Sequence, residues 1–127
     1  MNRKEIAIGD VYYAKVECNG SVQGGYRPYV VMQNDIGNKY SPNVVLIPLT
    51  TAIKKEKMPT HVVIRCKESG LPKDSVALCE NPISFPKEEL GEFITKLPQN
   101  IMKDLAVANS LASSAISFLN LDELLAL

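Results

Sequence analysis

The fold is decided around residues 23–35, which read Gln-Gly-Gly-Tyr-Arg-Pro-Tyr-Val-Val-Met-Gln-Asn-Asp. The β-branched and aromatic residues at 29–33 predict a strand, because such side chains pack well on a pleated surface. Upstream, residues 8–18 alternate, with tyrosine, alanine and valine at every second position, which is the period of another half-buried strand. The glycine-rich residues 19–25 lie between them and predict the turn that joins the two strands.

Three further segments have the character of short strands. They are residues 43–49, 60–65 and 75–79. Pro48 interrupts the first of them and predicts a bulge or a sheet edge, because proline has no N–H to donate to a ladder. Five short strands joined by loops of this length favour a small barrel.

The last third of the chain changes to a helical pattern. Its apolar stripe consists of Ile101, Leu105, Ala108 and Ala112. These spacings of four and three predict an amphipathic helix with Pro98 in its first turn. Asn120, followed three residues later by Glu123, has the pattern of a capping box and predicts a second short helix. The expected fold is mainly β with C-terminal helices.

The length predicts one domain over residues 1–127, because 127 residues can bury a sizeable core and no linker or repeat interrupts them. The N-terminus lacks the apolar run of a signal peptide, and no stretch reaches the roughly 18 apolar residues of a membrane span. We therefore expect a cytoplasmic protein that has no membrane segment.

Composition limits the chemistry that the chain can perform. Lys plus Arg number 14 and Asp plus Glu number 14, so any nucleic-acid binding must come from a local patch. The three cysteines, Cys18, Cys66 and Cys79, have no CxxC spacing, and His61 is the one histidine. Neither a zinc site nor a disulfide framework is indicated, and we expect no metal, no cofactor and reduced, buried thiols.

Arg27 is the candidate for chemistry that the residues themselves indicate. Two glycines beside it allow a ligand to approach the backbone, and its planar guanidinium next to Pro28 is suited to phosphate. The alternative is a hairpin turn with a solvated arginine.

Residues 23–35 also resemble a known family, because they match the QGGxRP turn and the VVIQND strand of MazF/PemK toxins. Further matching segments follow in order: 36–42, 49–50, 57–62 (KxPTHV) and 73–76 (KDSV). The resemblance implies an SH3-like small barrel of the CcdB/PemK toxin type. It also implies a homodimer, an endoribonuclease that attacks single-stranded mRNA through the RNA's own 2′-hydroxyl, and a cognate antitoxin protein.

Carried over to this chain, the resemblance places the family's catalytic arginine at Arg27 and its catalytic threonine at Thr50. Arginine can stabilise the extra negative charge of a phosphorane, and a threonine hydroxyl can orient the attacking 2′-hydroxyl. The residues expected to bind RNA are Gln23, Gly24, Gly25, Tyr26, Lys54 and Lys55. Tyr26 is a candidate to stack on a base, whereas the lysines alternatively form a solvated charged face.

The chain departs from the family pattern at two places. Val22 stands where many members have glutamate, a candidate general base, and residues 78–84 lack the arginine that often follows the family's LEQI motif. His61 has the chemistry of an acid or base, but the resemblance places it in a segment distant from the site, which favours a structural role.

Two alternatives belong to other functional classes. A non-catalytic relative could bind RNA or inhibit a protein target such as gyrase, and Val22 favours this reading. An SH3-like interaction domain for proline-rich ligands is disfavoured, because the chain has no tryptophan.

Overall fold

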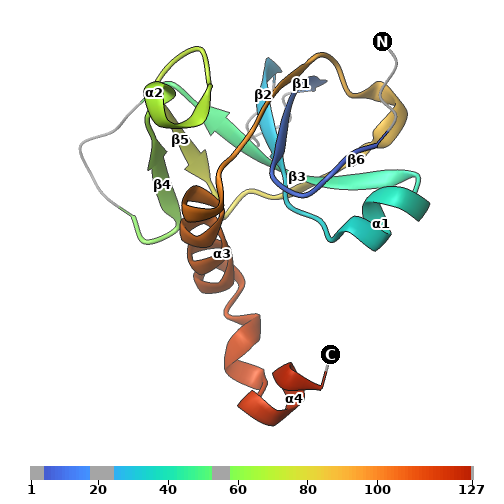
Figure 1. Cartoon of the computed structure of the whole chain (residues 1–127), viewed down its shortest axis with the longest axis vertical. Coiled ribbons are helices and arrows are strands. Elements are labelled where there is room, and N and C mark those ends of the chain that lie inside the picture. The colour runs from blue at the N-terminus through green and yellow to red at the C-terminus, as the bar shows by residue number, and fades with distance from the viewer. Residues whose placement is uncertain (1–4, 18–24, 53–57, 127) are drawn as a thin grey trace.

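The computed structural model describes residues 5–17, 25–52 and 58–126, and over them the chain is mainly β with C-terminal helices, as predicted (Figure 1). The strands are β1 (Asp10–Val16), β2 (Gly25–Val31), β3 (Asn43–Thr50), β4 (His61–Ile64), β5 (Ser75–Leu78), β6 (Ile83–Pro86) and β7 (Phe93–Lys96). The α-helices are α1 (Asp35–Tyr40), α2 (Cys66–Ser69), α3 (Gln99–Ser113) and α4 (Leu121–Leu125), and the 3₁₀ turns are η1 (Lys87–Glu89) and η2 (Ala115–Phe118).

The strands pair antiparallel in the order β4-β5-β3-β2-β1-β7, and β6 pairs with β3 off this path. Strand β3 changes partner along its length, because residues 43–46 pair with β6 whereas Leu49 and Thr50 pair with β5. Pro48 lies between these two partners and pairs with Tyr29 of β2 on its other side. The gap between the two partners accommodates the missing N–H of Pro48, but β3 is a central strand with a regular register to β2, so the predicted bulge or sheet edge is not observed there.

Neighbouring residues on a strand point to opposite faces, and the core accordingly has two clusters. Val11 and Val30 belong to one cluster, which also contains Leu105 and the other buried residues of α3. Tyr12 and Tyr29 belong to the second cluster, which β6 helps to close. Alternate residues of β1 and β2 therefore point toward alternate clusters, so the position of a residue along its strand tells which of the two sheet faces it occupies.

Several elements differ from the sequence expectation. Strand β2 begins at Gly25, four residues before the predicted strand, and β6, β7 and α2 were not predicted. Strand β6 ends at Pro86, and a proline within so short a segment argues against a strand assignment from sequence. Helix α1 occupies a segment that we predicted as a loop. Its first turn is capped by Asn34, whose side-chain oxygen accepts a hydrogen bond from the Gly37 amide at 2.8 Å.

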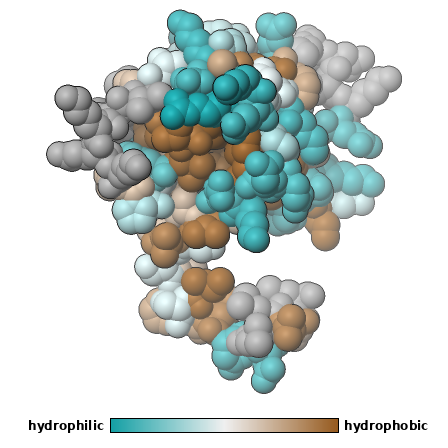
Figure 2. Space-filling view, turned by 60° about the vertical axis from the view of Figure 1, so that its left-hand side comes forward, coloured by the Kyte–Doolittle hydropathy of each residue, from teal (hydrophilic) through white to brown (hydrophobic). Residues whose placement is uncertain are grey.

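The C-terminal helices follow the prediction in outline. The stripe residues of α3 are buried or half-buried, although Pro98 is the residue before the helix rather than part of its first turn. Asn120 caps α4, because its oxygen accepts a hydrogen bond from the Glu123 amide at 2.8 Å. Figure 2 shows that the segment beyond α3 projects from the body, with brown apolar surface on it. No helix in the described part of the chain is long and apolar enough to cross a membrane.

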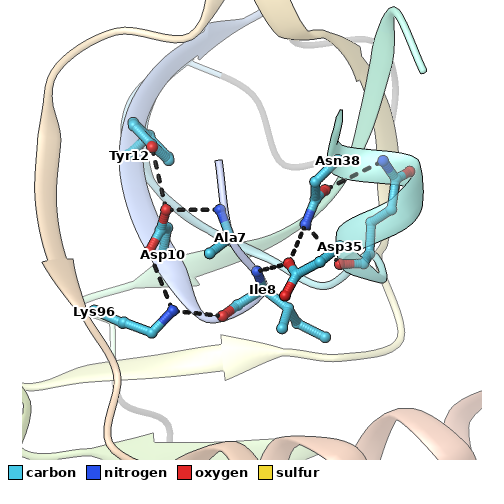
Figure 3. Close-up of polar contacts among 8 residues, drawn as sticks. Ala7, Ile8, Asp10, Tyr12, Asp35, Asn38 and Lys96 are labelled. Carbon is cyan, nitrogen blue, oxygen red and sulfur yellow. Dashed lines mark hydrogen bonds and ion pairs between the residues drawn. The ribbon is translucent and has the colours of Figure 1, made fainter. Parts of the chain in front are cut away.

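A polar cluster fixes the segment that precedes β1 (Figure 3). Buried Asp10 accepts hydrogen bonds from the Ala7 amide at 2.9 Å and from the Tyr12 hydroxyl at 3.2 Å. Its other oxygen lies 3.7 Å from the Lys96 ammonium, which is on β7. Asp35 of α1 accepts a second amide of the same segment at 2.8 Å. These contacts join β1, β7 and α1.

Candidate active site

Arg27 of β2 and Thr50 of β3 lie on neighbouring strands. The ladder between β2 and β3 ends at the Tyr29–Pro48 pair, and continuing its register by two residues along each strand would set Arg27 opposite Thr50. Residues directly opposite each other on antiparallel strands place their side chains on one face. The register thus indicates that the two residues that the sequence proposed for catalysis share one face of neighbouring strands.

Both side chains are accessible to a ligand only in part, because Arg27 and Thr50 are each half-buried. The Thr50 hydroxyl accepts a hydrogen bond from the Ala52 amide at 3.2 Å, which fixes its orientation. A hydroxyl has one proton and two lone pairs, so this contact leaves capacity for an RNA 2′-hydroxyl or phosphate oxygen.

Tyr29 lies on the same face, two residues beyond Arg27, and no motif in the sequence indicates a role for it. Its side chain is 0% exposed, and its hydroxyl has no hydrogen-bond partner among the residues that the structure describes. Burial raises the pKa of the Tyr29 phenol, and the positive charge of Arg27 partly opposes this effect. The guanidinium therefore acts electrostatically on a buried phenol beneath the candidate site.

We expect Tyr29→Phe to leave the free energy of unfolding unchanged or to raise it by about 1 kcal/mol, because it removes a buried hydroxyl with no partner. Tyr12→Phe is the matched control, since the same change removes the bond to Asp10 and should lower stability by about 1 to 2 kcal/mol. Urea unfolding of both variants measures the difference. Equal losses of unfolding free energy in the two variants would mean that the Tyr29 hydroxyl also forms a hydrogen bond.

The residues expected to bind RNA are only partly described. Gly25 opens β2 with φ +88°, a left-handed conformation that favours glycine, and a Cβ there would meet nothing within 4 Å. Tyr26 is exposed, but its side chain leaves β2 from the face opposite to Arg27. Gln23, Gly24, Lys54 and Lys55 lie outside the described residues, as does Val22.

The other titratable residues form contacts away from Arg27. His61 Nε2 lies 2.8 Å from a Glu80 carboxylate oxygen, and β5 and β3 separate its strand from β2. Burial acts to raise the pKa of Glu80, but hydrogen bonds from His61 and neighbouring groups outweigh it, so the pKa is lowered. This arrangement agrees with the structural role favoured for His61.

The structure describes the thiols of Cys66 and Cys79. Cys79 is buried, and this burial raises its pKa to about 11, so the thiol stays protonated near neutral pH. Cys66 is half-buried, and Cys18 lies outside the described residues. Within residues 5–17, 25–52 and 58–126, no group of three or more His, Cys, Asp or Glu side chains is placed to hold a metal ion.

This chain is similar to known toxins and endoribonucleases. A family model described as "PemK-like, MazF-like toxin of type II toxin-antitoxin system" matches residues 7–112. Endoribonuclease EndoA of Bacillus subtilis (strain 168) is 41% identical over 111 residues, which are 87% of this chain and 96% of that relative. Endoribonuclease MazF of Staphylococcus epidermidis is 48% identical over 98 residues, which are 76% of this chain and 82% of that relative.

A solved structure shares the fold. An endoribonuclease in complex with its cognate antitoxin, from a mycobacterial species, superposes with a TM-score of 0.70 at 23% identity. The superposition covers 87% of this chain and 96% of that one. The expected toxin-type fold is thereby confirmed.

Proposed function

Since this chain belongs to the PemK-like, MazF-like toxins of type II toxin-antitoxin systems, we propose that it is an endoribonuclease that cuts single-stranded RNA without a metal. The observation that supports the proposal is the register of β2 with β3, which, continued two residues beyond the Tyr29–Pro48 pair, would set Arg27 opposite Thr50 on one face of the sheet. The names of the two relatives favour nuclease activity over the non-catalytic alternatives.

In the proposed reaction, the 2′-hydroxyl of the RNA attacks the adjacent phosphorus, and the bond from phosphorus to the 5′-oxygen of the next nucleotide breaks. The products are a 2′,3′-cyclic phosphate and a free 5′-hydroxyl. The phosphorane formed on the way has one more negative charge than the phosphodiester. Arg27 would stabilise this charge with two parallel hydrogen bonds, which is the interaction that its planar fork allows.

Thr50 would position the reacting groups. Its hydroxyl is oriented by the Ala52 amide and can contact the 2′-hydroxyl or a phosphate oxygen. Many members of the family have a glutamate at the position of Val22. Valine cannot accept a proton, so this position does not supply a general base in this chain. We propose that positioning and charge stabilisation by Thr50 and Arg27 supply most of the acceleration.

The proposal extends to partners and cell compartment. The solved relative is a complex with its cognate antitoxin, which supports an antitoxin as partner of this chain. A homodimer is supported by exposed apolar side chains beyond α3, of which Phe118 is 86% exposed. The whole chain, residues 1–127, would act as one toxin domain in the cytoplasm, where mRNA is translated. Gln23, Gly24, Gly25, Lys54 and Lys55 remain candidates to contact the RNA.

We expect the purified protein to cut a mixed-sequence RNA in the presence of excess EDTA at the same rate as in magnesium buffer. The reason is that the attacking group belongs to the substrate and the charge is neutralised by arginine rather than by a metal. Sequencing the new RNA ends identifies the cut, and the terminal phosphate is identified by mass spectrometry.

Two results would count against the proposal. A preparation that binds RNA but leaves it intact would support a non-catalytic relative. Cleavage that is lost in EDTA and restored by added magnesium would contradict the metal-free reaction.

A further inference from the structure

Tyr13 and Tyr26 form an aromatic stack at the end of the β1–β2 hairpin, on the sheet face opposite to Arg27. Their ring centroids are 5.0 Å apart and their planes differ by 9°. Tyr13 pairs with Pro28 and Tyr26 with Lys15, so the two rings are diagonal neighbours on one face. The backbone at Tyr13 is fixed by the residue that precedes β7, because the Tyr13 amide donates a hydrogen bond to the Glu92 carbonyl at 2.9 Å.

Most of the Tyr26 side chain remains open to a ligand. Tyr26 is 62% exposed, although one side of its ring lies against Tyr13. A tyrosine that only stabilised the hairpin would gain by burying both sides of its ring, whereas most of Tyr26 stays exposed. Lys15, also exposed, lies directly opposite Tyr26 in the register and provides a positive charge beside the ring.

We propose that the Tyr13–Tyr26 stack is a platform on which one base of the RNA substrate stacks, with Lys15 near the adjoining phosphate. This inference rests on the proposed function. Single-stranded nucleic acids are bound by aromatic rings next to basic side chains, because every base has a π-face and every linkage a negative charge. The aromatic stack together with the Lys15 ammonium favours an RNA base over a protein partner as ligand. The side chains of a protein partner would not require a positive charge at this position.

The platform is close enough to the candidate active site to act on the same strand of RNA. Tyr26 and Arg27 are consecutive, so their Cα atoms are about 3.8 Å apart while their side chains leave opposite faces of β2. An RNA strand that crosses the exposed start of β2 can place a phosphate at Arg27 and turn a neighbouring base onto Tyr26. Tyr26 would then contribute to substrate affinity and not to the chemical step.

The chain has no tryptophan, so a single introduced indole reports on this surface alone. The probe is a labelled oligonucleotide of the cleaved sequence with 2′-deoxyribose at the cut, which lacks the attacking hydroxyl. We expect saturating probe to quench the emission of the Tyr26→Trp protein by half or more, because a base stacks on the indole. Tyr40→Trp is the matched control: Tyr40 is 74% exposed on α1, and its indole should be unaffected.

Affinity measured by anisotropy provides a second readout. Tyr26→Ala should weaken probe binding between about 5-fold and 150-fold, and Tyr26→Phe should restore it, since phenylalanine keeps the ring. The slope of log K against log salt should stay as in the parent, because no phosphate contact is removed. Lys15→Ala should reduce that slope by about one. In cleavage assays, Tyr26→Ala should raise KM and leave kcat within about 2-fold.

Several outcomes would overturn the inference. Tryptophan emission that is not quenched at saturating probe would overturn the base-stacking role of Tyr26, and so would RNA affinity in Tyr26→Ala equal to that of the parent. Neither result would contradict the proposed nuclease activity. Weakened self-association or antitoxin binding in Tyr26→Ala, with RNA affinity unchanged, would assign the stack to a protein interface. By contrast, a parent protein that neither binds nor cuts RNA would refute the proposed function itself.

Discussion

Arg27→Ala is expected to lower the single-turnover rate of RNA cleavage by about 10²- to 10³-fold. The guanidinium is the positive charge that the register of β2 with β3, continued past the Tyr29–Pro48 pair, would set opposite Thr50, and its removal would take this donor from the phosphorane. The loss should fall on kcat more than on KM, since the interaction strengthens as the transition state forms. Rapid mixing of excess protein with one defined RNA, followed by gel analysis, measures the rate.

Two controls make this result specific. Arg27→Lys keeps the charge but loses the planar fork, and should recover only part of the rate. Arg65→Ala removes an exposed arginine that pairs with Asp74 at 3.3 Å elsewhere on the surface, and should cleave at the parent rate. If Arg27→Ala cleaves as fast as the parent while thermal unfolding shows both to be folded, Arg27 is not the catalytic arginine.

Asp10→Ala is expected to lower the free energy of unfolding by about 2 to 4 kcal/mol, which is a large part of the stability of a small domain. The buried carboxylate accepts bonds from the Ala7 amide and the Tyr12 hydroxyl, and its loss leaves both donors without this partner. Both lie where the chain enters β1, beside α1 and β7 (Figure 3). Urea unfolding measures the change.

Lys96→Ala tests whether the ion pair or the buried hydrogen bonds dominate. Lys96 is 58% exposed, so its 3.7 Å contact with Asp10 is screened by solvent, and its loss should lower stability by less than about 1 kcal/mol. Equal effects of the two substitutions would show that the charge pair, and not the bonds to Ala7 and Tyr12, holds this region.

The local pattern of the sequence was sufficient for the longer elements. The alternation over residues 8–18 gives β1, and the stripe of Ile101, Leu105 and Ala108 gives the buried face of α3. In both cases the period is repeated within one segment, so the side chains of that segment alone reveal which face is buried. Helix α1 was missed because it has only six residues, one of them Gly37, and because the burial of Asn38 depends on contacts outside the helix.

For the candidate site, too, some features follow from the sequence and others only from the tertiary structure. The sequence by itself determined which residue types are present, namely an arginine and a tyrosine after two glycines and a threonine at the end of a later strand. Only the tertiary structure decided that the strands of Arg27 and Thr50 are neighbours, that Tyr29 is buried and that Tyr26 turns to the face opposite to Arg27 and stacks on Tyr13. The physical reason is that a strand's period specifies its two faces but not its partner. The pairing of β2 with β1 and β3 comes from contacts between segments far apart in the chain.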